Sequence, residues 1–172
     1  MDSFYKKWQD VPVAEWKKRW PNFSPEEIAS NIFTDKKNGV KVKGPILIDT
    51  HALDMLQALR ITLGKPFIVN SAYRDPQYNK DINGAKNSMH MQGKAFDISM
   101  ANHNPAEFEA AAIKAGFKGI GHYPGSNFMH IDARQAPQAV RWQGTGANAK
   151  WFPKSTQTTF SGDEPKPQTV LD

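Results

Sequence analysis

Helix-like spacing of apolar positions appears in the middle of the chain. Between residues 50 and 63, leucines recur every third position, which places them on one face of a helix, and Gly64 is a typical terminator. Two further helices are predicted where Ser or Asn is followed by Pro and then, two residues later, by Glu, at 24–27 and 104–107. Such polar side chains bind the N–H groups that a helix start leaves free, and the second of these helices should run to Gly116.

Strand-like alternation follows in the second half of the chain. From 94 to 100, apolar side chains point to one face of the predicted strand, and Asp97 points to the other face between two small residues. Apolar runs bounded by turn residues predict further strands over 66–73, 117–123 and 127–132. The chain is therefore predicted to contain both helices and strands.

The remaining segments are more polar or irregular. Residues 1–21 form a basic, Trp-rich arm, which we expect to pack over the domain at 22–149, with membrane or wall contact as the alternative. A polar loop or hairpin is predicted at 35–45, and a long loop with a helical turn at 76–93. Long loops inside compact domains are often functional. The segment 150–172 is rich in Pro, Ser, Thr and Gln and is predicted to be a disordered tail.

Composition narrows the partners and the chemistry. The 172 residues carry a net charge of +5, which favours polyanions such as nucleic acid, anionic lipid or bacterial wall polymers. No basic helix or known binding motif indicates specific nucleic-acid recognition. We also expect the protein to be a monomer. No apolar run reaches the roughly 18 residues of a transmembrane helix. The first residues lack a signal-peptide pattern, so we expect a protein made in the cytoplasm.

The absence of cysteine leaves His, Asp and Glu as the strong metal ligands. His90 lies in a glycine-containing loop, and Asp97 follows seven residues later, where its carboxylate is costly to bury without a partner. His130 and Asp132 share one face of the predicted strand that carries them. Two histidines and one carboxylate, with water in the fourth position, are a typical catalytic Zn²⁺ set. Each residue taken alone is also compatible with an ordinary packed side chain.

Two other histidines have no acidic or histidine neighbour at ligand spacing. His51 and His103 lie at the starts of the predicted helices, and we interpret both as surface residues.

Several motifs in a fixed order resemble the zinc D-alanyl-D-alanine carboxypeptidase family, including its phage endolysin and prophage members. The resemblance covers about 23–142 and depends on four segments: Phe23–Ala29, Ser71–Arg74, Ser88–Ile98 and Phe128–Asp132. It implies an α+β fold, with a small antiparallel sheet that carries the zinc ligands and flanking helices, similar to hedgehog domains. By motif position, the resemblance assigns Zn²⁺ to His90, Asp97 and His130.

The resemblance also implies a role for Arg74. The guanidinium would hold the carboxylate or carbonyl of the substrate and the negative charge that develops on it, an interaction that is worth several kcal/mol when the donor is fixed in place. The alternative for Arg74 is a surface ion pair with Asp75 or Asp81.

The proton acceptor is less well defined by the resemblance. Better-studied members have an acidic general base three residues before the last histidine, where this chain has Asn127, and an amide cannot accept the proton. Asp132 is one replacement, or else a carboxylate that orients His130. His122, on the neighbouring predicted strand, is a further candidate for proton transfer or oxyanion binding, or else a half-exposed strand residue.

These features together predict a zinc metallopeptidase that hydrolyses a peptide bond of bacterial peptidoglycan, as a D,D-carboxypeptidase or an endopeptidase. We expect it to act on the cell wall after release, in phage or prophage lysis or as a virion component. The alternative is a non-catalytic, zinc-containing module that binds the wall, and Asn127 is the residue that favours it.

Overall fold

The computed structural model describes residues 1–144, so the tail predicted for 150–172 lies outside the described residues. The strands are β1 (Phe4–Tyr5), β2 (Asn31–Asp35), β3 (Val40–Lys43), β4 (Ile46–Leu47), β5 (Val69–Ser71), β6 (Ala95–Ser99), β7 (Gly119–Tyr123), β8 (Phe128–Asp132) and β9 (Val140–Gln143). The α-helices are α1 (Val13–Arg19), α2 (Pro25–Ile28), α3 (Thr50–Leu63), α4 (Pro76–Asp81) and α5 (Pro105–Ala115). Short 3₁₀ turns are η1 (Trp8–Asp10), η2 (Met89–Gln92) and η3 (Pro124–Ser126).

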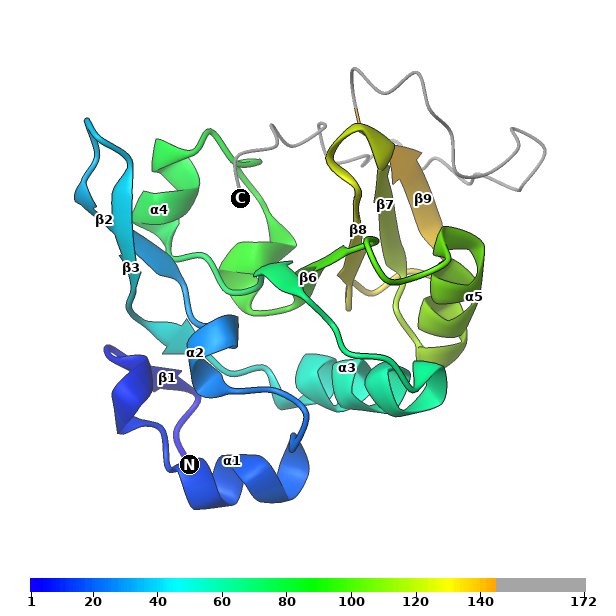
Figure 1. The fold of residues 1–172 in the computed structure, drawn as a ribbon, viewed down its shortest axis with the longest axis horizontal. Helices are drawn as coiled ribbons and strands as arrows, with labels where there is room; N and C mark the ends of the chain where they lie inside the picture. The colour runs from blue at the N-terminus through cyan, green and yellow to red at the C-terminus, as the bar shows by residue number, and fades with distance from the viewer. Residues whose placement is uncertain (145–172) are drawn as a thin grey trace.

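A five-stranded sheet forms the centre of the α+β fold. Its order is β5-β6-β8-β7-β9 (Figure 1). The first four strands pair antiparallel, as predicted, but β9 runs parallel to β7 along the edge. β9 was not predicted, because its alternation of apolar and polar side chains extends over only four residues, Val140–Gln143.

The two faces of this sheet have different neighbours. One face carries Phe96 and Ile98 of β6 and their partners on β8 and β7, and it packs with the leucine face of α3 and with α5 in one apolar core. Asp97 lies between those two residues and therefore points to the other face, opposite His130 of β8. The apolar core therefore covers one face of the sheet, and the polar side chains of Asp97 and His130 lie on the opposite face.

The predicted helix boundaries are confirmed by the capping groups. Ser24 and Glu27 form the reciprocal capping box of α2, and Asn104 accepts a hydrogen bond from the backbone of Glu107 at the start of α5. The left-handed conformation of Gly64, with φ of 65°, ends α3 where the sequence predicts it.

The polar segment 35–45 contains the turn and second strand of a hairpin, formed by β2 and β3, which projects at the left of the view in Figure 1. The segment 76–93 is more ordered than a long loop, because it begins with α4 and ends with η2. Its last turn contains His90, so this ordered segment positions a candidate ligand.

The basic N-terminal arm packs over the domain, as predicted. Trp16 and Trp20 are completely enclosed in the core that also contains the leucines of α3. The indole of Trp16 donates a hydrogen bond of 2.7 Å to the carbonyl of Phe23, and that of Trp20 donates one of 2.9 Å to Asp54. These two side chains are therefore not free for membrane contact, and the arm shares one core with the rest of the domain.

Across residues 1–144, we find no helix with the length and apolar character that a membrane crossing requires. The surface assignment of His51 is confirmed, but that of His103 is wrong. The ring of His103 packs against Phe67 and Phe108, and its Nε2 lies 3.0 Å from the carbonyl of Pro66.

Candidate metal centre

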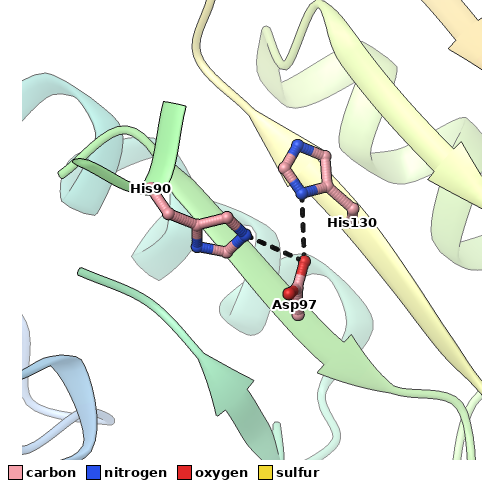
Figure 2. Close-up of side chains that lie close together, drawn as sticks. All are labelled: His90, Asp97 and His130. Atoms are coloured by element: carbon pink, nitrogen blue, oxygen red, sulfur yellow. Dashed lines mark hydrogen bonds and ion pairs between the residues drawn. The ribbon is translucent and has the colours of Figure 1, made fainter. Parts of the chain in front are cut away.

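Three side chains from different elements meet on the polar face of the sheet. His90 comes from η2, Asp97 from β6 and His130 from β8, and all three are buried (Figure 2). One potential ligand atom from each lies within 4.8 Å of the other two. Asp97 and His130 are directly opposite each other in the strand pairing, so the sheet register brings these two residues together.

The ring of His90 is oriented by the backbone. Its Nδ1 lies 2.6 Å from the carbonyl oxygen of Ala72, which can only accept, so Nδ1 carries the hydrogen and Nε2 has the lone pair. Nε2 is buried, has no hydrogen-bond partner among the described residues, and faces Asp97 Oδ1 at 3.2 Å. Burial, followed by the positive charge of Arg74, lowers the pKa of His90 to about 4, so the ring is neutral near pH 7.

His130 has an oxygen on each side of its ring. Nε2 lies 2.7 Å from Asp132 Oδ2, and Nδ1 lies 3.0 Å from Asp97 Oδ1. A neutral imidazole has only one N–H. If Nε2 donates to Asp132, the Nδ1 lone pair faces the same oxygen of Asp97 as the lone pair of His90. Three electron-pair donors then point at one another, an arrangement that a bound cation would stabilise. The donor set of two imidazoles and one carboxylate therefore fits a zinc ion.

The two oxygens of Asp97 have separate partners. Oδ1 faces both histidines, while Oδ2 accepts a hydrogen bond of 3.3 Å from Nη2 of Arg74. The positive charge of Arg74 beside Oδ2 favours the ionised form of this buried carboxylate. The carboxylate is therefore ionised and can act as a metal ligand.

Arg74 contacts this cluster through Asp97 and is not on the surface. Its side chain is 1% exposed and also donates to Ser71 at 3.1 Å. The alternative of a surface ion pair is wrong, because Asp75 caps α4 and Asp81 pairs with Lys36. The observed contacts support a role for Arg74 in holding Asp97.

Comparison with known proteins identifies the family of the chain. The model of the family described as Peptidase M15 matches residues 21–132, a span that contains the whole cluster. The chain belongs to the peptidase M15 family.

Its relatives in the M15 family include peptidoglycan peptidases. The chain is 34% identical over 119 residues to the peptidoglycan L,D-endopeptidase MepK of Escherichia coli strain K12, and this match covers 64% of each chain. It is 39% identical over 75 residues to the zinc D-Ala-D-Ala carboxypeptidase of Streptomyces albus G, covering 42% of this chain and 29% of that relative. The chain therefore matches less than two thirds of the length of these relatives.

Asp132 of this M15 chain is fully enclosed, and both of its carboxylate oxygens are occupied. Arg134 donates to Oδ1 through Nε at 2.8 Å and to Oδ2 through Nη2 at 2.7 Å, while His130 contacts Oδ2. Burial works to raise the pKa of Asp132, but hydrogen bonds from Arg134 and His130 outweigh burial, and the net pKa lies below the usual range. This geometry favours the orienting role over that of a general base.

His122 lies on the opposite face of the sheet from the cluster. It is opposite Met129 in the strand pairing, one position away from the pair of Gly121 with His130. Its Nε2 lies 3.1 Å from Oε1 of Glu109 on α5. The candidate role of His122 in proton transfer or oxyanion binding is therefore corrected, because strand alternation points the ring away from the metal ligands.

A small cleft lies beside His130, and several residues that line it were not anticipated from the sequence. Its lining comprises Ala85, Asn87, Ser88, Met89, Tyr123, His130, Arg134 and Trp142. No carboxylate is among these residues, within the part of the chain that the structure describes. Asn127, at the position of the expected base, ends η3 in a left-handed turn with φ of 54°.

Two glycines within β7 are the sequence feature that could have indicated the side chains packed around His130. A Cβ added to Gly119 would lie 2.1 Å from an oxygen of Asp132, and one added to Gly121 would lie 2.7 Å from the ring of Trp142. Glycine within a strand often marks the close approach of another group. Here the two glycines make room for the side chains that surround His130.

The role of Asp132 can be tested by the substitution Asp132→Asn, which is nearly isosteric. If Asp132 orients His130, zinc affinity should fall by about 10–100-fold, and activity should return when zinc is raised. Chelator competition and hydrolysis measured against zinc concentration would show this. Full zinc affinity with a catalytic rate lowered about 10²–10⁴-fold would instead identify Asp132 as the general base.

Proposed function

We propose that this M15 chain is a zinc-dependent peptidase that hydrolyses a peptide bond of bacterial peptidoglycan. The observation that carries the proposal is the convergence of ligand atoms from His90, Asp97 and His130 in one buried group. The M15 assignment supports it, and so do the names of two relatives, a peptidoglycan L,D-endopeptidase and a zinc D-Ala-D-Ala carboxypeptidase.

The residues of the chain have separate tasks in this proposal. His90, Asp97 and His130 would hold the zinc ion, which supplies an activated water molecule and polarises the scissile carbonyl. Ala72 and Asp132 fix the two imidazole rings through hydrogen bonds to their other nitrogens. Arg74 holds the second oxygen of Asp97, and its burial favours this role over direct contact with the substrate.

The first activity to test is that of an endopeptidase. The match to the L,D-endopeptidase covers 64% of this chain, whereas the match to the carboxypeptidase covers 42%.

Mass spectrometry of purified muropeptides incubated with zinc-loaded protein tests the proposal. We expect new fragments whose masses identify one peptide bond, and we expect a chelator to abolish them and added zinc to restore them. Intact muropeptides after incubation with fully zinc-loaded protein would contradict the proposed hydrolysis.

A second candidate function is a non-catalytic, zinc-containing module that binds the cell wall. It is favoured by the absence of a carboxylate among the described residues that line the cleft, together with Asn127 in place of an acidic residue. Sedimentation of isolated walls separates the two functions. A peptidase releases soluble fragments, whereas a binding module sediments with the walls and releases none.

We also propose that the protein acts as a monomer on the wall after release from the cell, in phage or prophage lysis or as part of a virion. The net charge of +5 supports attraction to an anionic wall. Purified protein added from outside should lyse cells whose walls are accessible. Lysis that requires export of the protein by the cell that makes it would contradict this proposal.

A further inference from the structure

Arg134 holds Asp132 with the geometry of a bidentate pair. Its Nε and Nη2 donate to separate carboxylate oxygens at 2.8 and 2.7 Å, and its backbone N–H donates to Oδ1 at 3.1 Å. Two parallel hydrogen bonds fix both the position and the plane of a carboxylate, which a single contact cannot do. The orientation of Asp132 is therefore set by Arg134.

The same guanidinium also takes part in the packing around His130. The centre of the Arg134 guanidinium lies 4.9 Å from the ring centroid of Trp142, and that indole lies 5.2 Å from the ring of His130. The indole Nε1 donates to the hydroxyl of Tyr123 at 3.0 Å. Gly121 leaves the space that this indole occupies. Arg134 thus contacts both groups that surround the imidazole, Asp132 by hydrogen bonds and Trp142 by its face.

We propose that Arg134 is a positioning residue for the metal centre, which acts on His130 through Asp132. This inference depends on the proposed zinc site and adds a residue that the family resemblance does not assign. Asp132 holds His130 through Nε2, so the direction of the Nδ1 lone pair follows from the plane of the carboxylate. Without Arg134, the carboxylate would lose its two fixed contacts, and the ring would be free to turn away from the zinc position.

An arginine meets this need better than a lysine. The carboxylate of Asp132 is completely buried, and a buried charge is costly unless it is paired and hydrogen-bonded. The planar guanidinium matches the two carboxylate oxygens, whereas an ammonium is a point charge that fixes one contact. Arg134 is itself only 17% exposed, which limits the freedom of the pair.

The first experiment compares zinc affinity in Arg134→Gln, Arg134→Lys and the wild-type protein by chelator competition. Loss of an outer contact to a metal ligand usually weakens binding by about 10–100-fold, and we expect about 10-fold for Arg134→Gln because Arg134 acts one residue further out. Arg134→Lys should recover part of this loss. It also replaces the glutamine variant if the latter does not fold.

Lys118→Gln is the matched control for charge. Lys118 also carries one positive charge and lines a surface pocket together with Arg134, but its side chain forms no hydrogen bond or ion pair with Asp132 among the described residues. The control should keep the zinc affinity of the wild type. Equal affinities for Arg134→Gln and Lys118→Gln would overturn the inference, whereas the absence of zinc binding in the wild type would overturn the proposed function itself.

A second variant moves Asp132 without a change of charge. Gly119→Ala places a Cβ where the Asp132 carboxylate lies, so it should displace the carboxylate and weaken zinc binding in the same direction as Arg134→Gln. Absorption spectra of the Co²⁺-substituted proteins report the geometry around the metal. We expect shifted bands for both variants and an unchanged spectrum for Lys118→Gln. Unchanged bands in Arg134→Gln would contradict the positioning role.

Discussion

Replacement of either His90 or His130 by alanine should remove most of the bound zinc and abolish hydrolysis. Each substitution leaves one imidazole and one carboxylate, and two protein ligands rarely hold zinc well. Metal analysis after dialysis should show about one zinc ion per chain in the wild type and a small fraction of that in either variant.

His51→Ala is the matched control, because His51 is an exposed histidine on α3 outside the cluster. It should keep both zinc and activity. Full zinc occupancy in His90→Ala would remove His90 from the ligand set, and the same result in His130→Ala would remove His130.

Asp97→Ala should have two large effects at once. It removes a metal ligand, and it leaves the guanidinium of Arg74 buried without its carboxylate partner. Removal of one partner of a buried ion pair typically costs about 3–5 kcal/mol of stability. Urea unfolding of the zinc-free proteins measures this second effect, because the loss of zinc then contributes nothing to the difference.

The double variant Asp97→Ala with Arg74→Met separates the two roles of Asp97. Replacement of the Arg74 guanidinium by an apolar side chain should recover part of the lost stability, while zinc binding should remain absent. The cycle also needs the single variant Arg74→Met. If the loss of unfolding free energy in the double variant equals the sum of the losses in the two single variants, Arg74 and Asp97 are not coupled, and the proposed structural role of the pair is wrong.

Local patterns in the sequence were sufficient for most of the elements. The leucine repeat of α3 and its terminator Gly64 depend on contacts within a few residues, and the capping groups of α2 and α5 depend on contacts three residues apart. Alternation along β6 also placed Asp97 on the face opposite the apolar core. Short elements such as β9 were missed, because four residues carry too little periodic signal for their pairing to be inferred.

The candidate ligands could be named from the sequence, but their neighbours could not. His90, Asp97 and His130 have recognisable spacing and motif context, so the sequence alone indicates them as one ligand set. The choice between two roles for Asp132 depended on which atoms reach its oxygens, and Arg134 became visible only in the structure. His122 could not be assigned to a face from its own motif, because the register of β7 against β8 decides it.

The sequence by itself therefore determined the class of fold, the family resemblance and the chemistry of a His-Asp-His metal set. These depend on local periodicity and on side-chain type, which the order of residues contains directly. Only the tertiary structure decided that Arg74 holds Asp97, that Arg134 and Trp142 surround the imidazole of His130, and that His122 faces the helices. Those contacts join segments that are far apart in the chain. The distances between the contacting atoms are set by strand register and helix packing, which cannot be inferred from any single segment.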